Sequence, residues 1–183
     1  MDREQLAKSL AGVPSAKVEE REHRARGFHL DVSLSPENLR QAVSVLDQAG
    51  FFIETITGVD WLGEKQALLK QAQAAAAAKA KAAGEETPPA PVAEATQAPQ
   101  PDDLEAVYDI NHYDELCRVA LRVRVSREAP SLPTISDIYV GALWHEREAR
   151  DFFGFDFVGH PYLVPLLLPE DADFHPLRKD FQA

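Results

Sequence analysis

The sequence predicts an α+β fold, in which a mainly antiparallel sheet is covered by helices and followed by an extended irregular C-terminal tail. Several short segments alternate apolar and polar residues, as strands do, whereas few segments have the apolar spacing of a helix. Strands with few helices between them are typical of antiparallel sheets that carry helices on one side. We expect a core formed by residues 1–63 and 104–153, an Ala/Pro-rich insertion at 64–103, and the tail at 154–183.

A short helix and then a strand are expected at the start of the chain. Residues 2–12 suit a helix, because Leu6 and Leu10 have the i, i+4 spacing of one helical face. Residues 28–32 alternate apolar and polar side chains with the period of two that is typical of a strand. We therefore expect the first strand to follow the N-terminal helix.

A second helix is expected after Ser35. Ser35 is a favourable N-cap, and Pro36 fits the first helical position. Gly50 is a favourable end for this helix. The apolar residues between these points fall on one face: Leu39, Val43 and Leu46.

Three further strands and a third helix complete the predicted core. Residues 51–60 are rich in aromatic and β-branched side chains, which favour a strand. Residues 106–112 and 117–125 form two more strands, and in the second of these valine and leucine alternate with arginine. Residues 135–153 are expected to be helical over most of their length. Beyond Gly154 prolines interrupt any regular pattern.

Residues 64–103 differ in composition from the rest of the chain. Alanine dominates residues 71–83, and prolines punctuate residues 84–101. Alanine with spaced lysines favours a helix but offers little surface to pack, and a proline-rich segment cannot continue a helix. We expect a marginal helix followed by a flexible return, inserted in the loop between two neighbouring strands. A docking segment for a partner is the alternative interpretation.

The overall composition excludes several classes of protein. The chain has 183 residues, with 19 Lys and Arg against 30 Asp and Glu, and a net charge of −11. This acid excess argues against binding to nucleic acid or to anionic lipid. A single cysteine, Cys117, excludes an internal disulfide and multi-cysteine metal sites. No apolar run could span a membrane and no secretory signal opens the sequence, so we expect a soluble, cytoplasmic protein.

The most charged motif lies at residues 144–154. If this segment is helical, Glu146 can pair with Arg150, and Arg147 with Asp151, because each pair is four residues apart. One interpretation of the motif is therefore an exposed helix that carries ion pairs.

The histidines leave two alternatives open. His145-Glu146 begins like the zinc-protease motif, but Ala149 stands where the second histidine is required. His160 and His175 each precede a proline, which favours turn residues that bond to the backbone over metal ligands. A stand-alone metal-dependent hydrolase that uses these three histidines is the other hypothesis, although they have no recognised ligand spacing.

Other catalytic patterns are missing from the sequence. Cys117 lies within an alternating strand pattern, which indicates a packed thiol. No glycine-rich phosphate loop and no glycine-flanked serine occur. The residues alone therefore favour an interaction protein whose tail, with the apolar run 166–168 and the cations Arg178 and Lys179, carries the binding residues.

The C-terminal residues resemble the sequence signature of the C-type subunit of NADH:quinone oxidoreductase, a hydrophilic component of respiratory complex I. The family pattern contains a tryptophan, Glu-Arg-Glu, an aspartate, an aromatic-Gly pair, a phenylalanine, Gly-His-Pro, Leu-Leu and Pro-Leu-Arg-Lys-Asp. The matching residues are Trp144, Glu146-Arg147-Glu148, Asp151, Phe153-Gly154, Phe157, Gly159-His160-Pro161, Leu167-Leu168 and Pro176-Leu177-Arg178-Lys179-Asp180. The order of elements upstream agrees with the α/β domain of that family.

The resemblance implies a non-catalytic subunit of the peripheral arm that binds no cofactor itself. Fe–S clusters and quinone, or a Ni–Fe site, are expected on partner subunits. The expected partners are the D-type subunit that lines the quinone site, on which the C-terminal tail would dock, and other peripheral-arm Fe–S subunits. The chain would support electron transfer from the cytoplasmic side of the inner membrane, which it would reach only through the complex.

The resemblance also implies which residues lock the structure or contact the partner. These are Trp144, Glu146, Arg147, Glu148, Asp151, His160, Pro161, Arg178, Lys179 and Asp180. Two departures leave an alternative complex open: Val164 and Pro165 stand where the family usually has two arginines, and Phe174 stands where it usually has glycine. That alternative is the equivalent subunit of an energy-converting NiFe hydrogenase or formate-hydrogenlyase-type complex, whose partner resembles the hydrogenase large subunit.

Overall fold

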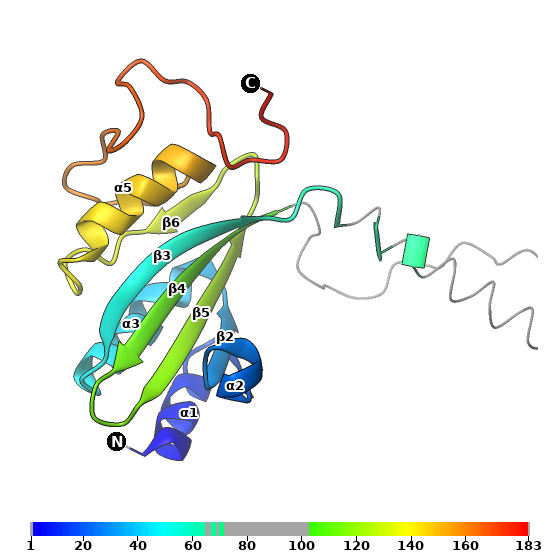
Figure 1. Cartoon of the computed structure of the whole chain (residues 1–183). Coiled ribbons are helices and arrows are strands. Elements are labelled where there is room, and N and C mark those ends of the chain that lie inside the picture. Colours follow the sequence, from blue (N-terminus) through cyan, green and yellow to red (C-terminus); the bar gives the residue numbers. More distant parts are fainter. Residues whose placement is uncertain (1, 65–66, 69, 72–102, 183) are drawn as a thin grey trace, which may run out of the picture.

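A computed structural model describes residues 2–64, 67–68, 70–71 and 103–182 of the chain (Figure 1). The elements follow one another in the order α1 (Arg3–Ala11), β1 (Lys17–Glu20), α2 (His23–Arg26), β2 (Leu30–Leu34), the 3₁₀ turn η1 (Pro36–Asn38), α3 (Leu39–Gln48), β3 (Phe52–Asp60), β4 (Leu104–His112), β5 (Cys117–Val125), β6 (Ser131–Pro133), α5 (Ala142–Phe153) and β7 (Asp156–Val158).

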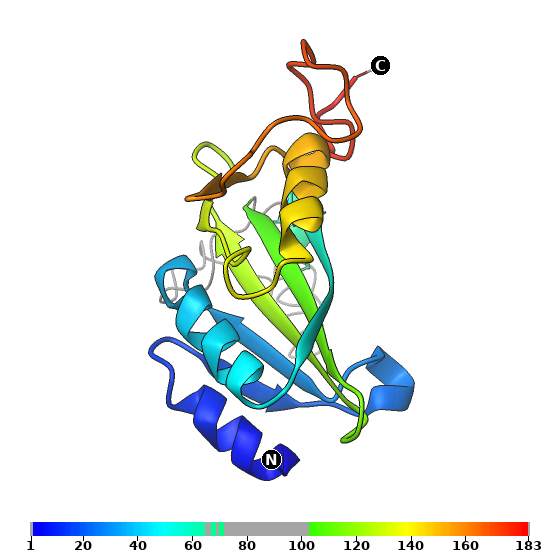
Figure 2. The same ribbon diagram turned by 90° about the vertical axis from the view of Figure 1, so that its left-hand side faces the viewer.

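The first five strands form one sheet in the order β1-β2-β5-β4-β3. All neighbours in this sheet are antiparallel except β2 and β5, which are parallel. The helices α1, α3 and α5 lie over one face of the sheet (Figure 2). The predicted α+β class with a mainly antiparallel sheet is therefore confirmed. The short strands β6 and β7 form a separate parallel pair.

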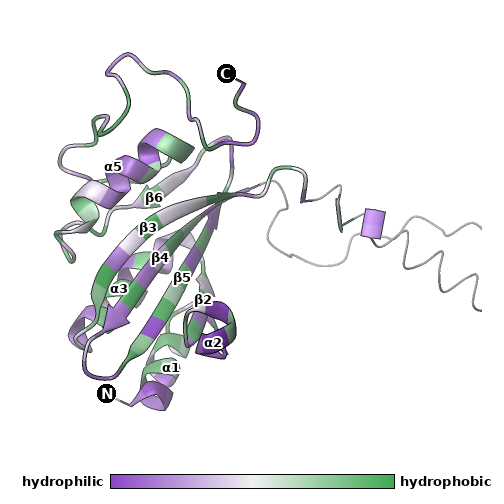
Figure 3. Ribbon diagram, viewed as in Figure 1, coloured by the Kyte–Doolittle hydropathy of each residue, from purple (hydrophilic) through white to green (hydrophobic). Residues whose placement is uncertain are grey.

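Strand β5 shows why the sequence folds into a two-faced sheet. Its residues Val119, Leu121 and Val123 are fully buried beneath the helices. The arginines that alternate with them point to the opposite face, since successive side chains of a strand point to opposite sides. Figure 3 shows this alternation of hydrophobic and hydrophilic residues along the central strands. Burial of the apolar set drives the pairing.

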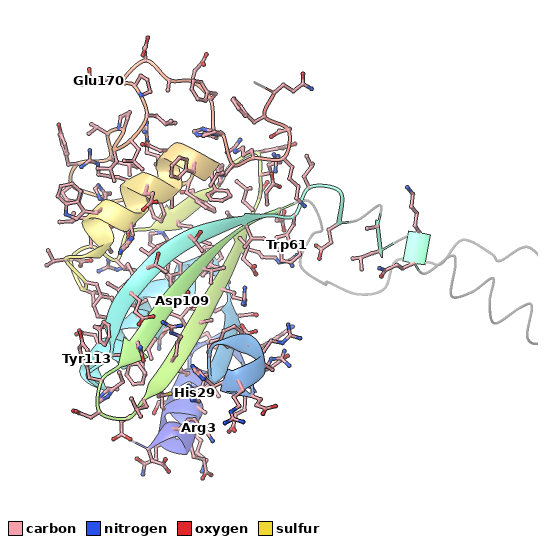
Figure 4. The ribbon with its side chains drawn as sticks, in the orientation of Figure 1. Arg3, His29, Trp61, Asp109, Tyr113 and Glu170 are labelled. Carbon is pink, nitrogen blue, oxygen red and sulfur yellow. The ribbon has the colours of Figure 1, made fainter. Side chains whose placement is uncertain are left out.

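Ion pairs neutralise the arginines on the other face of the sheet. Arg122 Nε donates to Asp31 Oδ1 at 2.7 Å, Arg124 Nε lies 3.6 Å from Glu105 Oε1, and Arg118 pairs with Glu54. Figure 4 shows Asp109 on this face, and Trp61 where strand β3 ends. Each arginine has an acidic neighbour, so this face is charged but locally balanced.

The structure differs from the prediction in the short elements and in one helix boundary. Strands β1, β6 and β7 and helix α2 have at most four residues each, too few for a recognisable period. The last helix begins at Ala142 instead of residue 135. Residues 135–141 form turns, because the Glu146 side chain accepts the backbone N–H of Ile135 and so holds this segment against the side of α5. The tail begins with strand β7 before it becomes irregular.

Ser35 does not cap the second helix as predicted, because no helical N–H donates to its side chain. Its hydroxyl instead accepts a hydrogen bond from Asn38 Nδ2 at 2.9 Å.

The insertion joins two neighbouring strands of the sheet, β3 and β4. Trp61 N–H donates to the Asp103 carbonyl at 3.0 Å, so the chain leaves and re-enters the sheet at one place. The predicted alanine-rich helix and proline-rich return lie almost wholly outside the described residues. The predicted domain boundaries therefore stay a prediction.

Candidate functional site

Asp151 on helix α5 organises the loop that contains residues 166–168. Its Oδ2 atom accepts the backbone N–H groups of Leu166 and Leu167, both at 2.8 Å, and of Leu168 at 3.2 Å. Burial alone would raise the pKa of the Asp151 carboxyl, but these three N–H donors outweigh it and hold the pKa below its usual value. The carboxylate thus serves as an anionic anchor for the tail.

Arg147, one helical turn before Asp151, holds the preceding part of the same loop. Its Nε donates to the Val164 carbonyl at 3.0 Å, and its Nη2 donates to the Pro165 carbonyl at 2.8 Å. The guanidinium also lies 5.7 Å from the ring centre of Trp144 and 5.4 Å from that of Tyr162. Cation–π attraction and two hydrogen bonds therefore fix Arg147 between the helix and the tail.

Glu146 points inward from α5 and is fully buried. Its Oε1 accepts the Ile135 N–H at 2.8 Å, and its Oε2 accepts the Thr134 hydroxyl at 2.5 Å. Burial raises the pKa of Glu146 to about 7, although these two hydrogen bonds oppose the rise. The buried hydroxyl of Tyr108 has no hydrogen-bond partner among the described residues. Burial, with a smaller contribution from the charge of Glu146, raises the pKa of Tyr108 well above its ordinary value.

His160 is the neutral Nε2–H tautomer. Its Nδ1 accepts the Tyr162 N–H at 3.0 Å, so this nitrogen carries no proton, while Nε2 donates to the Leu143 carbonyl at 3.2 Å. Burial lowers the pKa of His160. The 4.0 Å separation between its Nε2 and Glu146 Oε2 is therefore not an ion pair.

The segment 175–178 closes the C-terminal end of α5. The last carbonyls of a helix have no partner within the helix and need donors from elsewhere. The donors are His175 Nδ1 to the Asp151 carbonyl at 2.9 Å, Leu177 N–H to the Phe152 carbonyl at 3.2 Å, and Arg178 Nε to the Phe153 carbonyl at 2.6 Å. The C-terminal segment thus acts as the cap of α5.

Asp60, at the end of strand β3, attaches the last residues to the sheet. Its Oδ1 pairs with Arg127 Nη1 at 2.5 Å, and its Oδ2 accepts the Lys179 N–H at 2.7 Å. Arg127 Nη2 also reaches Asp180 at 2.6 Å. Burial would raise the pKa of Asp60, but the hydrogen bonds with Arg127, Lys179 and Leu62 hold it below the usual value. The tail therefore bonds to both α5 and the sheet.

Four exposed apolar side chains follow the tail and the start of α5. We call Val140, Trp144, Tyr162 and Leu167 the apolar stripe; their exposed fractions are 73%, 60%, 64% and 61%. Trp144 and Tyr162 both contact Arg147, and the backbone of Leu167 is bonded to Asp151. Isolated exposed apolar residues are ordinary, whereas several on a loop that hydrogen bonds hold in place form an ordered apolar surface.

The two ion pairs expected along α5 do not form, so that prediction is wrong. Glu146 and Arg147 bond to other segments, while Asp151 bonds to the tail and lies 3.5 Å from Arg150. The other residues singled out from the sequence lie where stated here: Trp144 on the apolar stripe, Glu148 half-buried on α5, Pro161 exposed beside His160, and Arg178, Lys179 and Asp180 in the C-terminal lock.

Sequence reasoning missed Asp60, Arg127 and Thr134. Their partners lie far away along the chain, and no local motif marks them.

His160 and His175 bond to backbone carbonyls, which agrees with the interpretation favoured for the two His-Pro pairs. No three His, Cys, Asp or Glu side chains in the described part of the chain are arranged to hold a metal ion. The hydrolase hypothesis therefore stays a hypothesis. Cys117 is buried, in agreement with a packed thiol. None of the helices in the described residues combines the length and the apolar character needed to cross a membrane.

The fold and the site together define an α+β domain that binds its own C-terminal segment and exposes several apolar side chains around the start of α5 and the tail. Residues 32–183 match the family described as "Respiratory-chain NADH dehydrogenase, 30 Kd subunit". The chain belongs to this family.

Individual relatives agree with this assignment. The C-type subunit of the NADH-quinone oxidoreductase of Roseiflexus castenholzii is 30% identical over 96% of this chain and 80% of its own length. The C-type subunit of the F(420)H(2) dehydrogenase of Methanosarcina mazei is 42% identical over 46% of this chain and 54% of that protein. The combined C/D protein of the NADH-quinone oxidoreductase of Pseudomonas fluorescens is 39% identical over 46% of this chain, but the match spans only 14% of that protein.

Solved structures share the fold. A chain of the membrane-bound sulfane sulfur reductase, an archaeal respiratory membrane complex, has a TM-score of 0.67 at 21% identity, covering 98% of this chain and 84% of that one. A trypsin-resistant fragment of Nqo5 has a TM-score of 0.59 at 24% identity, covering 89% of this chain and all of the fragment.

Proposed function

We propose that the chain is a non-catalytic peripheral-arm subunit that docks on the D-type subunit at the quinone site and so supports electron transfer. The apolar stripe is the contact surface, and the locked tail holds it in shape. Fe–S clusters and quinone belong to the partner subunits in this proposal. The chain then reaches the cytoplasmic side of the membrane only through the complex.

The single observation that carries the proposal is an exposed apolar surface on a loop that side chains of α5 hold in place by several hydrogen bonds. Tyr162 and Leu167 are both more than half exposed, yet the loop between them is held by Arg147 and Asp151. Ordering such a loop before binding reduces the entropy lost on association. Aromatic residues on a fixed scaffold are also typical of the energetically important centre of an interface.

The Pseudomonas fluorescens relative favours the D-type subunit as the partner. Its name joins C and D in one protein. Two proteins that are fused in one organism commonly bind each other when they are separate chains in another, because fusion keeps an existing interface at high effective concentration.

Binding of surface variants to the cognate D-type subunit tests the proposal. Leu167→Glu changes only an exposed side chain, because Asp151 binds the backbone N–H of this residue. We expect its dissociation constant to rise at least about tenfold, since a buried charge costs several kcal/mol. Leu116→Glu is the matched control: this leucine is 78% exposed, between β4 and β5.

The control site lies well away from the tail. Figure 4 shows Tyr113, in the same turn, at the opposite end of the molecule from Glu170 in the tail loop. Unchanged binding of the Leu167 variant, or equal weakening by both variants, would contradict docking through the apolar stripe.

A second candidate function is that of the equivalent subunit in a hydrogenase-type complex. One relative, that of Methanosarcina mazei, is named as a subunit of an F(420)H(2) dehydrogenase and not of an NADH-quinone oxidoreductase. The subunits that co-purify with the chain distinguish the two candidates. NADH- and flavin-binding subunits would assign it to complex I, whereas a large subunit with Ni-binding cysteine pairs would assign it to a hydrogenase complex.

A further inference from the structure

Two hydroxyl groups form a row with the buried carboxyl group of Glu146. Thr134, which follows β6, places its Oγ1 atom 2.5 Å from Glu146 Oε2 and 2.8 Å from Ser136 Oγ. The Ser136 N–H also donates to Thr134 Oγ1 at 3.1 Å, which holds the two hydroxyl groups in place relative to each other. The three side chains therefore form one continuous row of hydrogen-bonded oxygen atoms.

The hydrogens in this row can be placed by counting donors and acceptors. A hydroxyl has one hydrogen and two acceptor lone pairs, and an ionised carboxylate can only accept. When Glu146 is ionised, the Ser136 hydroxyl donates to Thr134, and the Thr134 hydroxyl donates to Glu146. When Glu146 is protonated, its own O–H donates to Thr134, and Thr134 donates to Ser136. The same positions of the oxygen atoms therefore satisfy both protonation states of Glu146.

The row ends at a hollow of about 510 Å³ in the surface. Thr134 and Ser136 both line this hollow, and so do the exposed residues Asp137 and Val158. Glu146 is fully buried and is not part of the lining. Water in the hollow can therefore reach Ser136, which is two hydrogen bonds away from the Glu146 carboxyl group.

The charged and titratable groups around Glu146 do not fix it in one protonation state. His160 Nε2 lies 4.0 Å from Glu146 Oε2, but it donates its hydrogen to a backbone carbonyl. Arg40 and Asp137 act on the pKa of Glu146 in opposite senses and are paired with each other by two hydrogen bonds. Tyr108, on β4, is neutral, because its own pKa is raised well above the ordinary value. Burial raises the pKa of Glu146 to about 7, so both of its protonation states are populated near neutral pH.

We propose that Glu146 is a proton-binding site that exchanges its proton with water through Thr134 and Ser136. On release, Glu146 passes its proton to Thr134, Thr134 passes its own to Ser136, and Ser136 passes its own to a water molecule in the hollow. Three O–H bonds break and three form, so that the carboxyl group becomes a carboxylate and the water becomes hydronium. Uptake follows the same steps in reverse. The inference is independent of the proposed function, because every group in the row belongs to this chain.

Carbon-13 NMR of the Glu146 carboxyl group in the full chain tests the proposal. The signal is assigned by its loss in Glu146→Gln. We expect it to titrate with a midpoint near pH 7, and relaxation dispersion at the midpoint measures the rates of proton uptake and release. A carboxyl signal that does not change between about pH 5 and pH 9 would overturn the proposal, because Glu146 would then keep one protonation state throughout.

Thr134→Val removes the central hydroxyl but retains the shape of the side chain. If Thr134 only stabilised the carboxylate, its loss would raise the midpoint through slower release and leave the uptake rate unchanged. A relay predicts slower uptake as well, by at least about tenfold. Thr134→Ser should restore the parent rate, and Thr57→Val, at an exposed position of β3, is the matched control. An uptake rate in Thr134→Val equal to that of the parent would overturn the relay.

Ser136→Ala tests the outer end of the row. Both hydrogen bonds to the Glu146 carboxyl group remain possible in this variant, since their donors are Thr134 and Ile135. We therefore expect slower uptake and release with little change in the midpoint, whereas Ser33→Ala, on the exposed part of β2, should leave the rates unchanged. Slow exchange of the Ile135 amide, which donates to Glu146, verifies that the site stays closed. Exchange of the Glu146 proton at the parent rate in Ser136→Ala would contradict passage through Ser136.

Discussion

The carboxylate of Asp151 accepts the backbone N–H of Leu167 at 2.8 Å, although the two residues are separated by 16 positions in the chain. The same oxygen accepts two neighbouring N–H groups, so one side chain of α5 orients a whole turn of the tail. Charge-assisted hydrogen bonds of this kind are stronger than neutral ones. The tail is therefore bound by its backbone, which leaves the Leu167 side chain exposed.

Replacement of Asp151 by asparagine should loosen this loop. The amide has one weaker acceptor in place of an anion, so we expect a loss of about 1–3 kcal/mol in the free energy of unfolding. Because the folded pKa of Asp151 is lowered from 3.8, its contribution is present above that value and is lost as the pH falls through the folded pKa. Denaturant titrations at several pH values measure both effects.

Asp156→Asn is the matched control, because Asp156 is exposed on β7. We expect this variant to retain the stability of the parent protein. A loss of similar size in both variants would contradict the anchoring role of Asp151.

Glu146 should make stability depend on pH in the opposite sense. Its folded pKa of about 7 lies above the ordinary 4.5, so folding favours the protonated form. The stability it contributes is fully present below pH 4.5 and is lost as the pH rises through about 7, which amounts to roughly 3 kcal/mol. Glu146→Gln, which remains neutral, should not lose stability in this range.

The quantity to measure is the difference in unfolding free energy between the parent and the Gln variant from pH 4.5 to pH 8. Burial lowers the pKa of His160, and this residue is present in both proteins, so the subtraction removes the contribution that the two proteins share. A difference that stays constant with pH would show that Glu146 is already ionised in the fold at low pH.

The sheet could be predicted from the sequence, whereas the site could be predicted only in its residue types. Burial alternates along β5 except at Ala120, which is buried between two buried neighbours, so periodicity identifies the strand. Sequence spacing assigns the charged residues of α5 to i, i+4 pairs, because it reveals only partners on the same helix. Arg147 and Asp151 instead bond to backbone groups of the tail, and Glu146 bonds to Thr134 and Ile135 before α5. The Asp60–Lys179 bond spans 119 positions. No periodic pattern encodes such contacts, and only the family resemblance marks most of the residues involved.

Arg147 should require its planar guanidinium and not only its charge. Two nitrogens bond to successive carbonyls, those of Val164 and Pro165, and the guanidinium lies near two aromatic rings. Lysine has a single ammonium and cannot reproduce this fork. We expect Arg147→Lys to speed amide exchange in residues 162–168 and to weaken partner binding, while Arg147→Ala should release the partner in a pull-down. Arg24→Lys, on the exposed α2, is the control and should change neither amide exchange in residues 162–168 nor partner binding. Full retention of the partner by Arg147→Ala would contradict docking through the tail.

Replacement of Gly154 by alanine should destabilise the protein through both backbone strain and side-chain collisions. A second glycine, Gly27, allows the strain to be measured alone. Gly154 has a φ of +76°, and a Cβ there would lie 2.4 Å from Arg178 Nη2 and 2.5 Å from His175 Nε2. Gly27 has a similar φ of +82°, with nothing within 4 Å. Gly27→Ala therefore measures backbone strain alone, about 1–2 kcal/mol. Gly154→Ala also displaces the two side chains that cap α5, so we expect a clearly larger loss of stability than in Gly27→Ala. The Leu177 amide, which donates to the Phe152 carbonyl, should exchange faster in the Gly154 variant. Equal losses in the two variants would mean that the C-terminal segment does not rest against Gly154, and that α5 is capped in some other way.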